Sequence, residues 1–413
     1  MSDNKESRTT QAVILAAGKA QRMLPLSNSR PKGMICVANQ PIIEHIIIEA
    51  QQAGIKDFIL VTGNNGDVIK NYFEDGSEIG VKITYRRQET PSGSGAAVQT
   101  MQDIVCQNFI VFNSDMLLSA ADIQQLVRAD GITIGVKEVS NPAGFGVVEE
   151  NDAKVCRILE KPVVASSRLV NTGAYTLNEH IFAAIDQTPL SSRGEIELTQ
   201  ALQLLIEQGM PVCCTKLESW RDISYPWDLL DANACVLSRL VSNNQGIIEE
   251  NVHIEGACNI GAGSIVRAGS YIAGPVVIGE NCDIGPNCFI RPATAIGDNC
   301  RIGNAVEIKN SIIMRGCKIP HLNYVGDSVI GENCNLGAGT KIANMRFDKE
   351  PVTVDGIPTG RIKFGAILGD GVQTGINVSI NAGSVIGNHA RIWPGIAVYD
   401  SVLDDVQLRK EQL

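Results

Sequence analysis

Two cationic residues follow the first predicted strand at a spacing that suits phosphate binding. Residues 11–17 (QAVILAA) read as a buried strand, Gly18 opens a turn, and Arg22 and Lys32 come next. Small residues such as Ala17 and Gly18 let backbone N–H groups approach an anion, while the two cations neutralise its charge. The segment therefore predicts a phosphate-binding turn, but one unlike a Walker P-loop, because the GxxxxGK(S/T) pattern is absent.

The pattern from Leu15 to Lys32 resembles LAAGxGxR…PLT…PK, the signature of sugar-1-phosphate nucleotidylyltransferases. Seven further motifs of that family follow in order: Gln88, Gly93-Ser94-Gly95, Asn113-Ser114-Asp115, Gly144-Phe145-Gly146, Glu160-Lys161-Pro162, Asn171-Thr172-Gly173 and Trp220-Arg221-Asp222. Each short motif is weak alone, but their collinear order makes the resemblance specific. It implies a Rossmann-like α/β domain, and strand-like runs alternate with helical stretches as that fold requires.

The resemblance also implies a reaction. The oxygen of a sugar 1-phosphate attacks the α-phosphorus of a nucleoside triphosphate, which requires charge neutralisation and positioning rather than a protein nucleophile. Asp115 and Asp222 match the family's Mg²⁺ carboxylates, because hard oxygen ligands suit that ion. Arg22 and Lys32 would face the triphosphate, and Lys161 the sugar phosphate. The matches to nucleotide contacts are Ala17, Gly18, Gln88 and Gly93, and the matches to sugar contacts are Gly146, Glu160 and Asn171.

The sequence departs from the family pattern at several positions that border these residues. Ala20 stands at the second glycine of GxG, Gly33 replaces the usual proline after PK, and Ser114 replaces the usual glycine before the aspartate. The segment Gly93-Ser94-Gly95 replaces the usual GTA. The charged residues of the pattern are all present, so we expect a catalytic domain. An altered nucleotide preference or a weakened first activity is the alternative.

The second half of the chain carries an aliphatic residue at every sixth position. The unbroken series is Ile248, Ile254, Ile260, Val266, Ile272, Ile278, Ile284, Ile290, Ile296, Ile302 and Ile308. The phase is lost around residues 309–323 and again at about 343–364, and we expect both breaks to be coil insertions that contact ligands. A period of six fits a solenoid of short strands and turns, with the aliphatic side chains inside. It resembles the left-handed parallel β-helix of hexapeptide-repeat acyltransferases, which are usually homotrimers with active sites between neighbouring coils.

The fusion order and residues 291–344 resemble the bifunctional enzymes that make UDP-N-acetylglucosamine. The matching segments are Arg291-Pro292, Glu307-Ile308-Lys309, HLNYVGD at 321–327, NLGAGT at 335–340 and Asn344. In that family the β-helix transfers the acetyl group of acetyl-CoA to an amino-sugar 1-phosphate. An ammonium must lose a proton before it attacks a thioester, and imidazole exchanges protons near neutral pH, so His321 is the candidate base. The resemblance implies that Arg291, Lys309 and Tyr324 hold the sugar phosphate, and that Asn335 and Asn344 orient the sugar and its amine.

One feature near the second break separates two types of that family. Met345 stands where a tyrosine is expected after Asn344, and the segment up to Gly365 looks more like the archaeal type. That type is linked with acetylation of both glucosamine and galactosamine 1-phosphates, so the epimer that is preferred stays open.

Composition restricts the partners and the compartment. The net charge of −10 argues against general binding of nucleic acid or anionic membrane. The first residues are polar and lack the apolar core of a signal peptide, so we expect a cytoplasmic protein. Twelve cysteines form no CxxC pair, and five of them share one phase of the repeat: Cys258, Cys282, Cys288, Cys300 and Cys334. At a fixed phase these five are expected to be small buried hydrophobes.

We therefore expect a nucleotidylyltransferase domain at 1–225, a linker helix at 226–245 and a left-handed β-helix acetyltransferase domain at 246–413. The favoured function is synthesis of a UDP-N-acetylhexosamine from acetyl-CoA and UTP with Mg²⁺, by a homotrimer or a hexamer of paired trimers. One alternative is a glucose-1-phosphate thymidylyltransferase or mannose-1-phosphate guanylyltransferase with a purely structural β-helix. The other is a regulatory homologue without catalysis, which the retained Asp115, Lys161 and Asp222 oppose.

Overall fold

The computed structural model describes residues 10–409, and the chain forms two compact units. The first unit runs to Ala20 and then holds Ser29–Met34 and Ile42–Asp222. The second unit holds Gln21–Asn28, Ile35–Pro41 and the chain from Ile223 onward. The predicted fold classes, a Rossmann-like α/β domain and a parallel β-helix, are both confirmed.

The first unit is built on a mixed nine-stranded sheet with the order β5-β4-β1-β6-β11-β8-β12-β10-β9. Its strands are β1 (Gln11–Ala16), β4 (Asp57–Thr62), β5 (Lys82–Arg87), β6 (Asn108–Asn113), β8 (Ile132–Glu138), β9 (Val147–Asn151), β10 (Lys154–Leu159), β11 (Leu169–Asn178) and β12 (Val212–Lys216). Strands β5, β4, β1 and β6 are parallel neighbours. Their carboxyl ends therefore share one edge, where the segments that follow β1, β5 and β6 meet. This edge receives Ala17, Gly18, Gln88 and Asp115.

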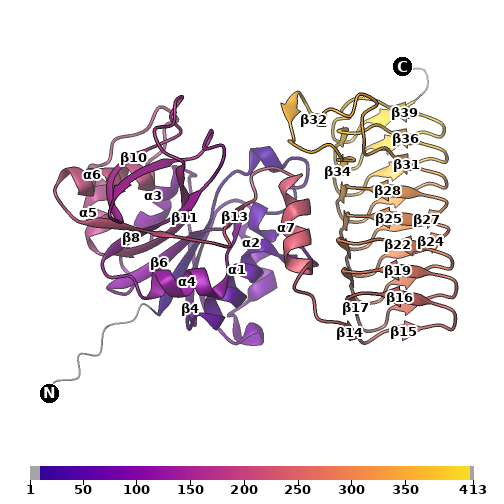
Figure 1. The fold of residues 1–413 in the computed structure, drawn as a ribbon, viewed down its shortest axis with the longest axis horizontal. Helices are drawn as coiled ribbons and strands as arrows, with labels where there is room; N and C mark the ends of the chain where they lie inside the picture. Colours follow the sequence, from indigo (N-terminus) through magenta and orange to yellow (C-terminus); the bar gives the residue numbers. More distant parts are fainter. Residues whose placement is uncertain (1–9, 410–413) are drawn as a thin grey trace. The chain divides into compact units, whose positions relative to one another are not determined.

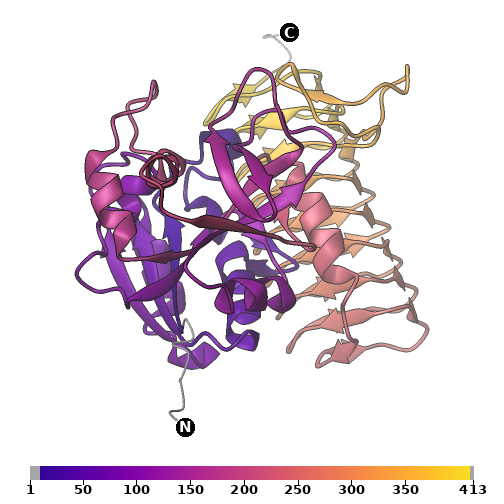
Figure 2. The ribbon, with the colours of Figure 1, turned by 60° about the vertical axis from the view of Figure 1, so that its left-hand side comes forward.

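Helices cover both faces of this sheet (Figure 2). They are α1 (Ile42–Gln52), α2 (Gly66–Phe73), α3 (Ser94–Gln99), α4 (Ala120–Val127), α5 (His180–Gln187) and α6 (Leu198–Glu207), with 3₁₀ turns η2 (Lys32–Met34) and η3 (Ser77–Ile79). Alternate strand residues such as Val13 and Ile59 pack against α3, α5 and α6. Their neighbours Ile14 and Leu60 are equally buried on the opposite face. A sheet that is buried on both faces needs the apolar strand runs seen in the sequence.

The second unit is a β-helix of three parallel sheets whose coils stack regularly from β14 to β39 (Figure 1). The first sheet contains β14 (Asn243–Asn244), β17 (Cys258–Ile260), β20 (Val276–Ile278), β23 (Thr294–Ile296), β26 (Ile312–Ile313), β29 (Val329–Ile330), β34 (Ile367–Leu368) and β37 (Val385–Ile386). The second contains β15 (Ile247–Ile248), β18 (Ile265–Val266), β21 (Asp283–Ile284), β24 (Arg301–Asn304), β27 (Lys318–His321), β30 (Asn335–Leu336), β35 (Gln373–Thr374), β38 (Arg391–Ile392) and β40 (Gln407–Leu408). The third contains β16 (His253–Glu255), β19 (Tyr271–Ala273), β22 (Phe289–Ile290), β25 (Glu307–Lys309), β28 (Tyr324–Gly326), β31 (Lys341–Ile342), β36 (Ser379–Ile380) and β39 (Ala397–Val398). From Ile260 onward the aliphatic residues of the repeat form one buried column inside the coils, as predicted, whereas Ile254 is only partly buried and Ile248, in the first coil, is exposed.

The first break in the repeat is not an insertion, so this part of the prediction was wrong. Ile278 pairs with Ile296, eighteen positions later, but Ile296 pairs with Ile313 and Ile313 with Ile330, seventeen positions later each. The corners that follow Ile308 and Val325 are each one residue shorter than the others. The aliphatic column continues without a gap, and only its sequence phase shifts. The second break is an insertion, which carries the hairpin β32 (Thr353–Val354) and β33 (Ile357–Pro358).

Helix α7 (Asp228–Leu237) lies in the second unit and packs on the β-helix. The fully buried Asn233 donates its amide to the carbonyl oxygen of Ala293 at 2.8 Å and accepts from the backbone N–H of Ala38, also at 2.8 Å. Ala38 belongs to the loop between the short strands β2 (Cys36–Val37) and β3 (Gln40–Pro41), which pair with each other. One side chain thus connects α7, this loop and a coil. Among residues 10–409, no helix is long and apolar enough to cross a membrane.

The predicted burial of the repeat cysteines is confirmed, and Cys317 joins them. None of the twelve cysteines, which all lie within residues 10–409, forms a disulfide bond, and the six in the β-helix are buried. All of these thiols except that of Cys258 face carbonyl oxygens of the next coil, as Cys317 does with Gly331 at 3.0 Å and Cys334 with Gly369 at 3.1 Å. Cys317 lies outside the six-residue phase only because the preceding corner is short.

These six thiols are expected to resist labelling in the folded protein. Burial raises the pKa of Cys258 to about 12 and that of Cys288 to about 11, so neither forms the reactive thiolate near neutral pH. A disulfide reagent at pH 8 should label the exposed Cys106 and Cys156 quickly, whereas denatured protein should release twelve equivalents. Rapid labelling of the β-helix thiols, located by mass spectrometry, would contradict the packing described.

Candidate functional site

The turn after β1 has the close backbone packing that an anion-binding segment requires. A Cβ atom at Gly63 would lie 2.8 Å from the carbonyl oxygen of Ala17, whereas nothing lies within 4 Å of one at Gly18. Ala20 adopts φ 49°, the left-handed conformation that the usual glycine adopts freely. Alanine keeps this conformation at a cost of about 1 kcal/mol. The departure therefore leaves the backbone path of the turn intact.

The two predicted metal carboxylates are brought together by a short antiparallel pairing. Asp115 follows β6, and β13 (Arg221–Asp222) pairs with β7 (Met116–Leu117) so that Asp222 stands opposite Met116. Lys32 places its Nζ 2.7 Å from Asp115 Oδ2. Asp115 therefore pairs with one cationic side chain, and the strand that pairs with β7 carries Asp222. No group of three or more His, Cys, Asp or Glu suited to a metal occurs among residues 10–409. Two carboxylates fit a Mg²⁺ whose other ligands are phosphate oxygens and water.

Two departures from the family pattern compensate each other. A Cβ atom at Gly33 would lie 3.0 Å from Ser114 Cβ and 2.6 Å from Ile43 Cδ1. The family pattern has the larger residue at 33 and glycine at 114, and this chain has the reverse. The same small volume is filled from the opposite side, next to Lys32 and Asp115. A side chain at position 33 and the side chain at position 114 would therefore compete for the same space.

This exchange predicts non-additive stability. Gly33→Ala should lower the free energy of unfolding of the first unit by roughly 1–3 kcal/mol, because it overpacks a filled space. Combining it with Ser114→Gly should recover part of that loss, since one of the two crowded contacts is removed. Thermal unfolding of wild type, both single variants and the double variant measures the coupling. Strictly additive effects would show that the two positions do not share the volume.

The loop that carries the predicted base contacts is held by Ile196. Gly93 has φ 104°, and a Cβ atom there would lie 2.4 Å from the carbonyl oxygen of Ile196. Gly95 donates its N–H to the same oxygen at 2.8 Å, and Gln88 donates its side-chain amide to the Gly93 carbonyl at 3.3 Å. Gln88 is buried. The structure therefore brings Gln88 and Gly93 together, and Gly95 leaves room for the approach of Ile196.

Gly93→Ala should destabilise the first unit more than Gly54→Ala. Gly54 has nearly the same φ, 99°, but nothing lies within 4 Å of an added Cβ. Both substitutions strain the backbone, and only Gly93→Ala also collides with Ile196, so the difference should be about 1–3 kcal/mol. Unfolding midpoints measure this difference, and the KM for nucleotide should rise for Gly93→Ala alone. Equal effects of the two variants would contradict the close approach.

The three predicted sugar contacts also converge. A Cβ atom at Gly146 would lie 3.5 Å from Glu160 Oε2 and 3.6 Å from Asn171 Cβ, and Asn171 donates its backbone N–H to the Gly146 carbonyl at 2.8 Å. Lys161, at φ 45°, places its Nζ 3.6 Å from Glu160. Arg193 bridges Glu160 at 3.1 Å and Glu197 at 2.6 Å. Burial raises the pKa of Glu197, although the charge of Arg193 opposes the shift.

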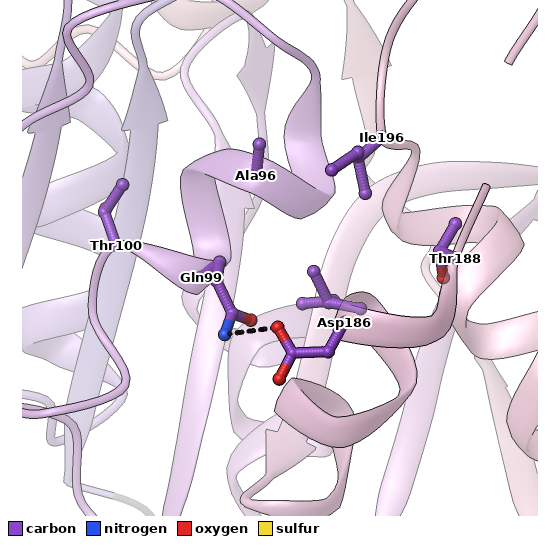
Figure 3. A pocket seen from close by; sticks show the side chains of 7 residues that line it. Ala96, Gln99, Thr100, Asp186, Thr188 and Ile196 are labelled. Carbon is purple, nitrogen blue, oxygen red and sulfur yellow. Dashed lines mark hydrogen bonds between the residues drawn. The ribbon is translucent and has the colours of Figure 1, made fainter. Parts of the chain in front are cut away.

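A separate cavity of about 330 Å³ lies between α3 and α5 (Figure 3). Its lining residues are Ala96, Gln99, Thr100, Ile185, Asp186, Thr188 and Ile196. Gln99 donates to Asp186 at 3.1 Å across it. None of the predicted site residues lines this cavity. Ile196 lines this cavity and also contacts Gly93 and Gly95 of the base-contact loop.

In the β-helix the two short corners build a connected polar cluster. Asp327, nearly fully buried, accepts from Lys309 Nζ at 3.2 Å, from Asn310 Nδ2 at 2.7 Å and from Asn344 Nδ2 at 2.5 Å. Asn344 also lies 3.3 Å from the Tyr324 hydroxyl. Burial, with nearby carboxylates, raises the pKa of Tyr324, so its hydroxyl stays a hydrogen-bond donor. The predicted residues Lys309, Tyr324 and Asn344 are therefore brought together.

The remaining predicted residues lie around this cluster. Arg291 follows β22, one coil from Lys309, and pairs with Glu307 at 2.8 Å. His321 ends β27 and Asn335 begins β30, both exposed and both on the second sheet. In the described part of the chain, no hydrogen bond joins His321 or Asn335 to the Asp327 cluster. His321 is nevertheless only a corner away from Tyr324, which begins the adjacent strand β28.

Comparison with known proteins decides the family. Residues 11–239 match the nucleotidyl transferase family model, and residues 272–392 match that of the GMPPB C-terminal domain. The bifunctional protein GlmU of Methanococcus maripaludis is 43% identical over 92% of each chain. The bifunctional sugar-1-phosphate nucleotidylyltransferase/acetyltransferase of Sulfurisphaera tokodaii is 40% identical, covering 94% of this chain and 97% of its own. The chain belongs to this bifunctional family.

The archaeal relatives confirm the predicted bifunctional enzyme, with nucleotidyltransferase and acetyltransferase domains in one chain. They oppose the reading of the β-helix as a purely structural domain. A solved structure from Bacillus anthracis, described as a glucose-1-phosphate thymidylyltransferase, matches 55% of this chain and 94% of its own with a TM-score of 0.50 at 27% identity.

Within this bifunctional nucleotidylyltransferase/acetyltransferase, sequence reasoning assigned no role to two charged residues that organise the sites. Asp327 ends the HLNYVGD segment, and its burial next to Lys309 and Asn344 depends on the short corners. Arg193 lies in a polar loop with no motif, yet it connects Glu160 to Glu197. The position of Asp327 within a matched motif was the one sequence feature that could have pointed to it. No sequence feature pointed to Arg193.

Proposed function

We propose that the chain is a cytoplasmic enzyme that acetylates an amino-sugar 1-phosphate with acetyl-CoA and then joins the product to UMP from UTP. The observation that carries this proposal is the Asp327 cluster. It fixes Lys309, Tyr324 and Asn344 around one buried carboxylate at the two corners where the coil geometry changes. A β-helix that only assembles subunits does not need a buried carboxylate that orients a lysine and an amide. Glucosamine 1-phosphate and galactosamine 1-phosphate are both candidate substrates.

In the acetyl transfer His321 takes a proton from the ammonium group of the amino sugar. The free amine attacks the thioester carbonyl carbon, the C–S bond breaks, and the leaving thiolate takes a proton, which His321 can return. Lys309 and Arg291 hold the sugar phosphate by charge, with the neutral Tyr324 hydroxyl as a further donor. Asn344 and Asn335 orient the sugar.

In the uridylyl transfer a phosphate oxygen of the acetylated sugar attacks the α-phosphorus of UTP. The bond from that phosphorus to the bridging oxygen breaks, and pyrophosphate leaves. Arg22 and Lys32 hold the triphosphate, Lys161 holds the sugar phosphate, and Gln88 and Gly93 contact the base. Gly146, Glu160 and Asn171 contact the sugar. Mg²⁺ held by Asp115 and Asp222 would offset the charge on the reacting phosphates.

We also propose that the chain acts as a homotrimer, with a hexamer of paired trimers as the alternative. His321 and Asn335 lie on one sheet of the β-helix, and Lys309 and Tyr324 on the next. Within one copy these two groups of residues meet only at a corner between the sheets. A neighbouring copy would therefore supply the rest of the site. The insertion also exposes Met345, Phe347 and Ile362, which suits contact with another subunit. Light scattering coupled to size exclusion measures the mass.

Two assays on the wild-type protein test the function. The first follows release of the coenzyme A thiol from acetyl-CoA with glucosamine or galactosamine 1-phosphate, corrected by a blank without sugar because Cys106 and Cys156 are exposed. The second follows pyrophosphate release from UTP and N-acetylglucosamine 1-phosphate, with Mg²⁺ or with a chelator. Absence of sugar-dependent thiol release with either epimer would overturn the first activity. Absence of Mg²⁺-dependent pyrophosphate release with UTP would overturn the second.

A further inference from the structure

We infer that Tyr225 is a positioning residue for Arg22 and sets how tightly the triphosphate of the nucleotide is held. The inference rests on the proposed function, which gives Arg22 its ligand. All the contacts that carry it lie within the second unit, which contains both residues. Tyr225 belongs to the ISYPWD segment before α7, a part of the chain to which no chemistry has been assigned.

The guanidinium of Arg22 rests on an aromatic ring. Its central carbon lies 5.4 Å from the centroid of the Tyr225 ring, within the range of a cation–π contact. Arg22 lies in the short turn η1 (Gln21–Met23) and is exposed to solvent. Among residues 10–409, no carboxylate pairs with it. A long exposed side chain on a single turn would otherwise sample several rotamers, and the ring restricts these.

An aromatic support leaves the arginine free for an anion. The ring attracts the cation through its face, so it takes none of the five N–H donors of the guanidinium and adds no negative charge beside the phosphates. Two cations of the first unit, Lys32 and Arg193, differ in this respect. Lys32 is paired with Asp115 at 2.7 Å and Arg193 with Glu197 at 2.6 Å. Arg22 is the candidate phosphate ligand whose donors are not already occupied by a carboxylate.

The ring of Tyr225 is itself fixed by its neighbours. Asp228 Oδ2 accepts the backbone N–H groups of Ser224 at 2.9 Å and Tyr225 at 2.7 Å, which pins the main chain. The Tyr225 ring stacks on the buried Trp227 ring with a centroid separation of 4.5 Å and an interplanar angle of 7°. Trp227 in turn meets the fully buried Phe364 edge to face at 6.3 Å. A rigid stack anchored in the β-helix therefore supports the arginine.

The hydroxyl group of Tyr225 makes no hydrogen bond to any residue in the range 10–409. The ring alone is therefore predicted to position Arg22, and the hydroxyl group is predicted to be dispensable. This difference distinguishes a positioning role from a general structural one. Tyr225→Phe keeps the ring and should retain wild-type behaviour. Tyr225→Leu keeps an apolar side chain on Trp227 but removes the π face, so Arg22 loses its support.

The experiment compares wild type with Tyr225→Leu, Tyr225→Phe, Arg22→Met and the double variant Arg22→Met/Tyr225→Leu. Calorimetry measures binding of inorganic tripolyphosphate, and steady-state kinetics measures pyrophosphate release from UTP. Tyr225→Leu should weaken tripolyphosphate binding and raise the KM for UTP by roughly 3- to 30-fold, the range of a cation–π contact, with a smaller change in kcat. Tyr225→Leu should add nothing in the Arg22→Met background. Trp393→Leu, which removes the ring beneath Arg409 at 4.6 Å, is the matched control and should change neither quantity.

The outcomes separate this inference from the proposed function. If wild type releases no pyrophosphate but binds tripolyphosphate, the uridylyl reaction fails and the binding series still decides the role of Tyr225. Unchanged binding in Tyr225→Leu, equal losses in Tyr225→Phe and Tyr225→Leu, or additive losses in the double variant would each overturn the inference. Failure of wild type to bind tripolyphosphate would overturn it as well. Unfolding midpoints of all variants check that each protein is folded.

Discussion

Replacing His321 with alanine is expected to lower the kcat of acetyl transfer by roughly 10²- to 10⁴-fold, the usual contribution of a positioned general base. The amine of an amino sugar is protonated at neutral pH and cannot attack the thioester until it loses that proton. His321 is exposed at the end of β27, so its loss removes no buried contact and should leave the unfolding midpoint unchanged. Thiol release from acetyl-CoA, measured with saturating amino-sugar 1-phosphate, gives kcat.

His253→Ala is the matched control for this prediction. His253 is also an exposed histidine on the β-helix, but it stacks on Tyr271 and has no proposed role. Uridylyl transfer should be unchanged in both variants, since His321 belongs to the β-helix alone. A His321→Ala variant that retains more than about a tenth of the wild-type kcat would exclude this residue as the base, given the range above.

The path of the β-helix could be predicted from sequence because the aliphatic residues inside the coils recur at a short, fixed spacing along the chain. Each aliphatic residue is six positions from the next, and period six leaves few alternatives to a solenoid. The prediction failed where a corner lost one residue. A deletion of one residue and an insertion both shift the phase of the six-residue repeat, so the sequence pattern alone does not distinguish them. The pairing of Ile296 with Ile313 distinguishes them in space.

The candidate sites show the same division between local and non-local information. The sequence motifs identified Lys32, Asp115, Glu160 and Lys309 as candidate site residues from their residue types and positions. Which partner each one meets depends on strand register and corner length, which no motif states. Asp327 reaches Lys309 because adjacent coils are offset by seventeen residues there, and Asp222 reaches the neighbourhood of Asp115 through the pairing of β13 with β7.

Asp115→Asn is expected to lower the kcat/KM of Mg²⁺-dependent uridylyl transfer by roughly 10²- to 10⁴-fold, because charge stabilisation by a bound metal is worth several kcal/mol. The amide keeps the shape of the side chain and can still accept from Lys32, which lies 2.7 Å from the carboxylate, so the fold should survive. A neutral oxygen attracts a divalent cation far less than a carboxylate does. Pyrophosphate release as a function of Mg²⁺ concentration should therefore show a weaker apparent affinity for the metal as well as a lower rate.

Asp103→Asn gives the comparison within the same unit, because Asp103 pairs with Arg86 at the surface and is not one of the predicted site residues. Acetyl transfer should be unaffected in both variants, which makes each protein its own control for folding and concentration. Loss of both activities in Asp115→Asn would indicate global damage rather than loss of a metal ligand. If uridylyl transfer by Asp115→Asn were normal at every Mg²⁺ concentration, Asp222 and phosphate oxygens would suffice to hold the ion. Asp115 would then serve chiefly to hold Lys32 in place beside the triphosphate.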